Sequence, residues 1–187
     1  MNDSAFIDSI IAKGKQASEK VIAEFDSLGI EQLNWKPSAE KWSIAQCLHH
    51  LITADSTYFP ALKEIAEGRY QKTGWQRNSP FTRFWGWVMV NQLGETPKRK
   101  MKAPKIFRPS SSKIEDDIIL NYNTQLDQLL KLIEDCKNID LDKTIIYSPV
   151  TKFITYSLRK TFQLLMQHEH RHINQGIKLK KLENFPG

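Results

Sequence analysis

Cysteine is scarce in this sequence of 187 residues, which contains only Cys47 and Cys136. Two cysteines so far apart do not make a disulfide framework or a cysteine-rich zinc knuckle, so we expect two reduced thiols. Long apolar runs are also missing, and no stretch approaches the ~20 residues that a membrane-spanning helix needs. The N-terminal stretch, MNDSAFIDSIIAKGKQ, lacks the basic start and apolar core of a secretory signal. The sequence therefore predicts a cytoplasmic protein without a membrane partner.

Motifs for nucleotide and serine chemistry are missing as well. The chain has no glycine-rich phosphate loop, no dinucleotide fingerprint and no serine-nucleophile elbow. At 187 residues it is long enough to bury a core without disulfides, and we expect residues 1–187 to form one domain. These absences remove nucleotide-dependent and acyl-serine reactions from the leading hypotheses.

Acidic residues are outnumbered by basic ones, 21 against 27, and the net charge of +6 raises the question of nucleic-acid binding. Much of the excess lies in Pro97 to Arg108, PKRKMKAPKIFR, which holds basic residues and no acid. Its prolines and its lack of helical periodicity predict a connector. Phe107 is its one aromatic side chain for stacking on bases, so we interpret the segment as a solvated loop rather than a nucleic-acid-binding arm.

Apolar residues recur at helical spacing in four long segments, and no run is typical of a strand. The second helix has a capping-box start, with Ser43 at its N-cap and Gln46 three residues later, and Gly68 is expected to end it. The sequence therefore predicts an all-α four-helix bundle with a long insertion between the second and third helices, in which FTRFWGWVMVNQL forms a short buried helix. The expected bundle helices are residues 4–28, 43–68, 112–136 and 157–182.

Five histidines fall into two clusters, His49 and His50 in the second helix and His168, His170 and His172 in the last. The last helix carries a stripe at three- and four-residue spacing, which faces a bundle core. One helical turn separates His168 and His172 on that stripe, so both side chains are expected to face the core. His170 lies on the opposite side of the helix and is expected to be exposed. The stripe consists of Leu158, Leu165, His168, His172, Gln175, Leu179 and Leu182.

Two inward imidazoles need partners, which are either buried polar groups or a metal ion. A third inward histidine from another helix favours the metal, because three imidazoles with one open coordination position form a catalytic type of site. His49 and His50 both lie beside the apolar stripe of the second helix and differ by about 100 degrees of rotation. Periodicity does not choose between them.

The same stretch also spells His-Glu-x-x-His, a zinc metalloprotease signature with Glu169 as its general base. That mechanism needs a substrate-aligning strand edge, and we expect none in this chain. The stripe places Glu169 on the flank of the helix, so we interpret the match as coincidental.

Other polar and aromatic residues near the histidines have simpler interpretations. Cys47 is expected to be a small core residue, and Asp55 a carboxylate on the helix surface rather than an outer-shell acid. Gln175 either bonds a ligand or a bound water, or is solvated near its helix end. The tryptophans are expected to pack the core rather than line a ligand pocket; they are Trp35, Trp42, Trp75, Trp85 and Trp87.

The segments NWKPSAEKWSIAQCLHHL and HEHRHINQ resemble the DinB/YfiT-like family of metal-binding four-helix bundles. The family motif has a tryptophan-serine pair at the start of the second helix, here Trp42 and Ser43. A ligand histidine stands before a leucine, here His50, and an H-x-x-x-H pair in the last helix corresponds to His168 and His172. The stretches KAPKIFRPSSS and VTKFITYSL also resemble the family, so the likeness covers most of the chain.

The resemblance implies that His50, His168 and His172 hold a divalent transition metal, zinc or nickel. It implies a metal-dependent hydrolase or a transferase of a low-molecular-weight thiol, acting on a small-molecule substrate; the alternative is a non-catalytic metal-binding protein with a structural or stress-response role. It is also compatible with a homodimer. Two features depart from the family pattern: His49 is a rival third ligand, and the aromatic insertion around Trp85 and Trp87 is not part of the motif.

Overall fold

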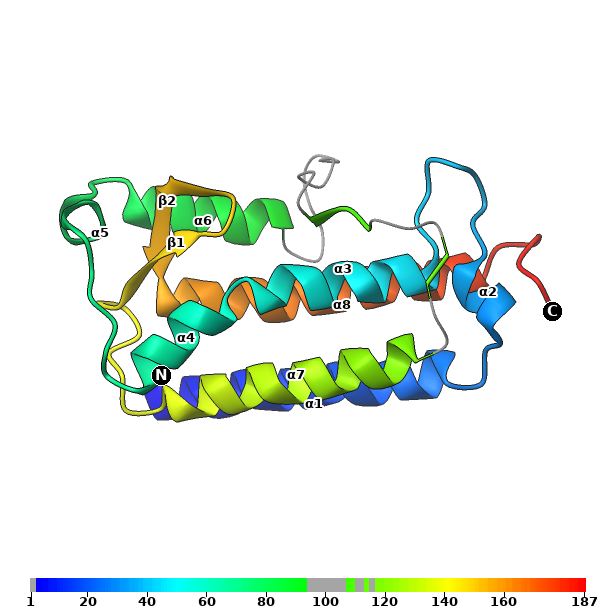
Figure 1. Cartoon of the computed structure of the whole chain (residues 1–187), viewed down its shortest axis with the longest axis horizontal. Coiled ribbons are helices and arrows are strands. Elements are labelled where there is room, and N and C mark those ends of the chain that lie inside the picture. Colours follow the sequence, from blue (N-terminus) through cyan, green and yellow to red (C-terminus); the bar gives the residue numbers. More distant parts are fainter. Residues whose placement is uncertain (1–2, 94–106, 110–112, 115–116) are drawn as a thin grey trace.

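Four long helices form the body of the protein in this computed structural model, which describes residues 3–93, 107–109, 113–114 and 117–187. They are α1 (Asp3–Phe25), α3 (Ile44–Ser56), α7 (Ile118–Asp135) and α8 (Leu158–Lys180). Both α7 and α8 pack against α3 and against α1 (Figure 1). The predicted all-α class is therefore confirmed, with four helices packed as a bundle.

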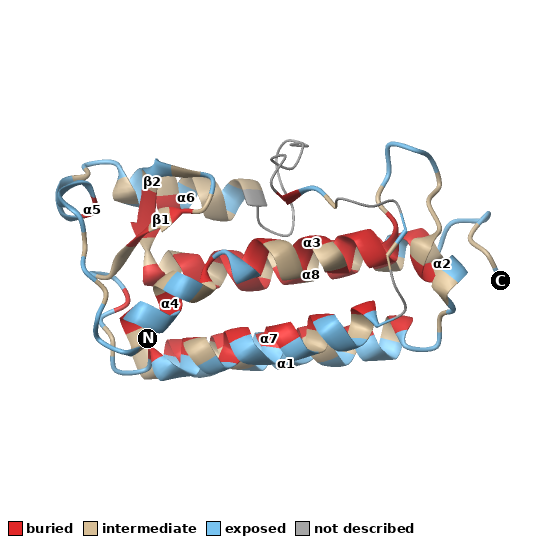
Figure 2. Cartoon of the chain, viewed as in Figure 1, coloured by how far each residue is buried: buried red, intermediate tan, exposed pale blue. Residues whose placement is uncertain are grey.

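The core of the bundle is apolar and comes from all four helices, whose buried faces turn inward (Figure 2). Burying such faces is what drives amphipathic helices together. Its largest fully buried side chains include Phe25, Leu48, Leu51, Tyr122, Leu126 and Phe162.

Helix α8 lies very close to α1 at Gly176. A Cβ atom at this position would approach Cζ of Phe25 to 2.8 Å, which is closer than packed atoms tolerate. The missing side chain thus makes room for the Phe25 ring, and it lets the helix that carries two of the histidines approach α1.

The start of α3 follows the sequence prediction. Ser43 lies just before the helix, and its hydroxyl accepts a hydrogen bond from the backbone N–H of Gln46. The Gln46 side chain in return accepts one from the Ser43 backbone N–H. This reciprocal cap satisfies amide groups that a helix start otherwise leaves unpaired, and it fixes where α3 begins.

The predicted continuous helix over residues 43–68 is wrong. The chain breaks after Ser56, and a separate helix, α4 (Phe59–Ala66), follows. Pro60 lies in the first turn of α4, where its missing N–H is tolerated, whereas in a helix interior it would remove a hydrogen bond. The glycine expected to end the segment does so: Gly68 follows α4 with φ 69°, a conformation that favours glycine.

A β-hairpin precedes α8, although the sequence pattern predicted no strand. Strand β1 (Ile145–Ser148) pairs antiparallel with β2 (Thr151–Ser157), with Ile146 opposite Tyr156 and an irregular register after Tyr147. The Tyr156 hydroxyl lies 2.8 Å from that of Tyr58, the residue directly before α4, which joins the hairpin to the start of α4. The hairpin thus anchors the start of α8.

The insertion contains two helices, α5 (Gly74–Asn78) and α6 (Thr82–Leu93). Helix α6 packs on β2 and α8, but it is not the buried helix that its composition predicted, because Phe84 and Trp87 are more than half exposed. The predicted basic loop from Pro97 lies outside the described residues, apart from its last two positions.

The remaining short helix, α2 (Ile30–Asn34), follows α1, and Trp35 beyond it packs edge-on against Phe185 at 5.4 Å between ring centroids. The predicted start of the third bundle helix near residue 112 is about six residues too early, since α7 begins at Ile118; residues 110–112 lie outside the described part. Among the described helices, none combines the length and the apolar character needed to cross a membrane.

Candidate metal centre

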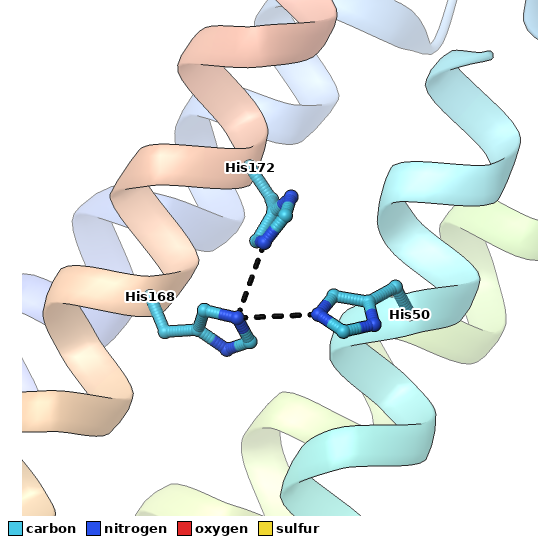
Figure 3. A group of neighbouring side chains, drawn as sticks. All are labelled: His50, His168 and His172. Carbon is cyan, nitrogen blue, oxygen red and sulfur yellow. Dashed lines mark hydrogen bonds between the residues drawn. The ribbon is translucent and has the colours of Figure 1, made fainter. Parts of the chain in front are cut away.

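Three histidine side chains converge between α3 and α8 (Figure 3). Nε2 of His168 lies 3.2 Å from Nε2 of His50 and 3.1 Å from Nε2 of His172. One ligand nitrogen from each ring lies within 4.8 Å of the other two. These are the three histidines that the sequence and the family resemblance singled out, so the fold brings the predicted residues together.

Local structure explains this convergence. His168 and His172 lie one turn apart on α8, so their rings project from the same face of the helix. His50 faces them from α3, which packs along α8. The ring of Trp42, just before the Ser43 cap, lies 4.8 Å from that of His50 and 5.8 Å from that of His172, measured between centroids. The start of α3 thus supports two of the three imidazoles.

A backbone contact fixes the protonation of His50. Its Nδ1 lies 2.7 Å from the carbonyl oxygen of Phe107, and because an oxygen of this kind only accepts, Nδ1 carries the proton and donates. The neutral ring then has a lone pair on Nε2, the atom that faces the other two histidines. Metal-ligating histidines are commonly oriented through their second nitrogen in this way.

All three imidazoles are held neutral by their surroundings. Loss of hydration, followed by the charges of His50 and Arg171, lowers the pKa of His168 to about 3. Burial, followed by the two other histidines, lowers the pKa of His172 well below its ordinary value, and Gln175 acts weakly in the opposite direction. Burial also lowers the pKa of His50, against the effect of the Phe107 carbonyl. Neutral imidazoles are the form that binds a metal ion.

The neighbouring candidates lie outside this group. His49 is partly exposed, and among the described residues the group that could hold an ion contains His50 instead. Cys47 is a buried free thiol whose pKa burial raises to about 12, so it is a core residue, as expected, and not a thiolate ligand. His170 is partly buried rather than exposed as predicted.

Two acids were misplaced by the sequence pattern. Glu169 was expected on the flank of the helix and Asp55 on a helix surface, yet both are fully buried. Tyr122 of α7 donates a hydrogen bond to Glu169, and the two carboxyl groups face each other across α3 and α8. Burial, then the charge of Glu169, raises the pKa of Asp55 well above its ordinary value. A single helical stripe did not reveal them, because Asp55 lies on α3 and Glu169 on α8, and each of these helices is covered by more than one partner helix.

This placement bears on the His-Glu-x-x-His motif. The Glu169 carboxyl is bonded to Tyr122 in the core, so it does not face a site shared by His168 and His172 as a general base must. The coincidental interpretation of the motif stands, although the reason is burial and not the predicted flank position.

A surface cleft of about 590 Å³ lies between α4 and the hairpin, lined by residues such as Tyr58, Tyr147 and Lys152. None of the three converging histidines lines it. The candidate site is therefore the histidine cluster and not this cleft.

The donor set fits a divalent transition metal. Three imidazole nitrogens suit zinc, nickel and related ions, whereas calcium and magnesium prefer oxygen ligands. Within the described part of the chain no fourth histidine, cysteine or carboxylate joins the group. A metal bound here would keep a coordination position for a water or a substrate, which distinguishes catalytic from closed structural sites.

Comparison with known proteins agrees with the sequence resemblance. A family model described as the DinB superfamily matches residues 15–175, which include all three histidines. The "Uncharacterized protein YuaE" of Bacillus subtilis (strain 168) is 27% identical over 166 residues, covering 84% of this chain and 89% of that protein. No solved structure matches.

Proposed function

The chain belongs to the DinB superfamily, and on that basis we propose that it is a metal-dependent enzyme with His50, His168 and His172 as its metal ligands. The observation that carries the proposal is the convergence of three Nε2 atoms, with 3.1 and 3.2 Å between neighbours, in rings held neutral. The ion is zinc or nickel, in keeping with the nitrogen donors.

Ligand number supports an enzyme over a purely structural metal site. Structural zinc sites are closed by four protein ligands, whereas this group contains three within the described residues. A divalent ion bound there supplies Lewis acidity, lowering the pKa of a water or thiol that occupies its remaining position. The reaction is accordingly hydrolysis or the transfer of a low-molecular-weight thiol to an electrophilic small molecule.

The surrounding residues prepare the site. The Phe107 carbonyl holds the His50 ring in one tautomer, and Trp42 packs against His50 and His172. Rings held in this way lose little freedom when they bind an ion. Glu169, buried and bonded to Tyr122, takes no part as a base.

The test begins with metal content. Protein loaded with zinc or nickel is expected to hold one ion per chain by elemental analysis, and His172→Ala is expected to hold none. Turnover is then measured with a thiol and an electrophile such as 1-chloro-2,4-dinitrobenzene, and with an ester or amide. Metal binding without turnover in either assay supports the non-catalytic alternative, and absence of metal binding by the native chain contradicts the proposal.

A further inference from the structure

Arg171 lies on α8 directly before the ligand His172, and it is partly buried. Within the described part of the chain its guanidinium makes no hydrogen bond or ion pair. Burial lowers its pKa, and no partner opposes that effect. A partly buried cation without a counter-charge is costly, since removal from water weakens its solvation.

Two other shielded basic side chains on α8 are paired with acids. The Arg159 side chain, 18% exposed, bonds Asp3 and Asp142. The Lys180 side chain, 28% exposed, pairs with Glu24. Arg171 lies on the same helix as both and, among the described residues, has no acidic partner.

Arg171 lies three residues after His168 and directly before His172 on α8, so its side chain leaves the helix beside those of both histidines. Its guanidinium charge also lowers the pKa of His50, His168 and His172. The adjacent acid, Glu169, is bonded to Tyr122 inside the core and does not neutralise it. With a divalent ion on three neutral imidazoles, this part of the bundle would hold two cationic groups and, among the residues that the structure describes, no carboxylate ligand.

We propose that Arg171 binds a carboxylate of the substrate, so that the natural substrate is a small carboxylate-bearing molecule held between the guanidinium and the metal. This rests on the proposed function and narrows its substrate class. The planar fork of an arginine matches a carboxylate with two parallel hydrogen bonds. An anion placed there also offsets the charge of both cationic groups, which explains why the protein keeps an unpaired arginine next to a cation site.

The test uses the full chain loaded with Co²⁺, whose visible absorption reports on its ligands, and acetate as the probe. Acetate is expected to change the spectrum of the native protein, while acetamide, its uncharged analogue, is not. Arg171→Gln is expected to weaken acetate binding about 10-fold or more, the loss typical of a charged hydrogen-bonded contact. Affinity for Co²⁺ should be unchanged or higher, because a neighbouring positive charge has been removed.

Two further variants control for fold and charge. Lys178→Gln removes an exposed cation from the last turn of α8 and is expected to leave acetate binding unchanged. Arg171→Lys retains the charge without the fork and is expected to give an intermediate affinity, which keeps the test valid if Arg171→Gln does not fold.

The outcomes separate the two proposals. If Co²⁺ binds, and the native protein and both Arg171 variants bind acetate with equal affinity, the role of Arg171 is overturned and the metal centre still stands. A native chain that binds no Co²⁺ overturns the metal centre and with it this inference.

Discussion

Nδ1 of His50 lies 2.7 Å from the backbone carbonyl oxygen of Phe107, a residue 57 positions later in the chain. The contact uses the main chain, so it survives substitution of the Phe107 side chain. It orients His50 and no neighbouring histidine, and this gives a direct way to separate the two candidates for the third ligand.

His50→Ala is expected to lower the affinity for Zn²⁺ by about 100-fold or more, because each ligand contributes a large share of a binding free energy of the order of 10 kcal/mol. His49→Ala, the matched control one residue away, should retain native affinity. Isothermal titration with Zn²⁺ measures both. A loss of Zn²⁺ affinity in His49→Ala, with none in His50→Ala, would show that His49 and not His50 is the third ligand.

Stability of the metal-free protein should depend on pH through His168. Its folded pKa is about 3, against an ordinary value of 6.5, so between these values the unfolded chain binds a proton that the folded chain does not. The folded state therefore loses stability as pH falls through this window, by up to about 1.4 kcal/mol per pH unit. Urea unfolding of the native chain and of His168→Gln measures the effect; the variant should show a shallower slope, and parallel curves would contradict the prediction.

Asp55 should make stability depend on pH in the opposite direction from His168. Its folded pKa is raised, so its contribution to stability is present below the unfolded value near 3.8 and is lost as pH rises toward the folded one. Asp55→Asn is expected to gain stability relative to the native chain as pH rises from 4 to 7, since one buried carboxyl fewer then has to ionise in the core. Urea unfolding of the native chain and of Asp55→Asn across this pH range checks the prediction. A difference in unfolding free energy that stays constant from pH 4 to 7 would count against it.

The hydroxyl of Tyr122 is expected to stabilise the fold through Glu169. Tyr122→Phe should lower the free energy of unfolding by about 1–3 kcal/mol, because a buried carboxyl loses its donor. Tyr147→Phe, which removes an exposed hydroxyl bonded to Thr73, is the matched control and should cost about 0.5 kcal/mol or less. Zn²⁺ affinity should be native in both variants; equal unfolding energies for the two would refute the role given to Tyr122.

Close packing of α1 against α8 predicts a cost for any side chain at Gly176. Gly176→Ala should lower stability by about 1–3 kcal/mol, since its Cβ would press on the Phe25 ring. Gly74→Ala is the control, because a Cβ there meets no atom within 4 Å. Thermal unfolding of both variants measures the difference in their stability. Equal stability of the two variants would show that α8 can shift away from Phe25 without penalty.

Much of the bundle and of its site followed from periodicity and caps. The stripe through His168 and His172 predicted their shared face, and the Ser43 cap predicted the start of α3. Choosing His50 over His49 needed the family motif, because both lie beside the apolar stripe. The metal identity, the cytoplasmic location, the single-domain organisation and the homodimer stay predictions.

Two of the wrong predictions have physical causes that are visible in the sequence. Pro60 inside the expected second helix was a signal for the break before α4. The runs around Ile145 and Thr155 are rich in β-branched and aromatic residues and flank a Ser-Pro step, which is a hairpin signal. Burial of Asp55 and Glu169 could not be deduced locally, because the tyrosine that bonds Glu169 comes from a third helix.

The distance along the chain between the converging histidines has a consequence for biosynthesis. His50 and His168 are separated by 118 positions. At translation rates of about 5–20 residues per second, roughly 6–24 s pass between the synthesis of the first and the second of them. An ion captured earlier would find one imidazole and no partner, so for the proposed metal centre we expect metal loading to follow the docking of α8.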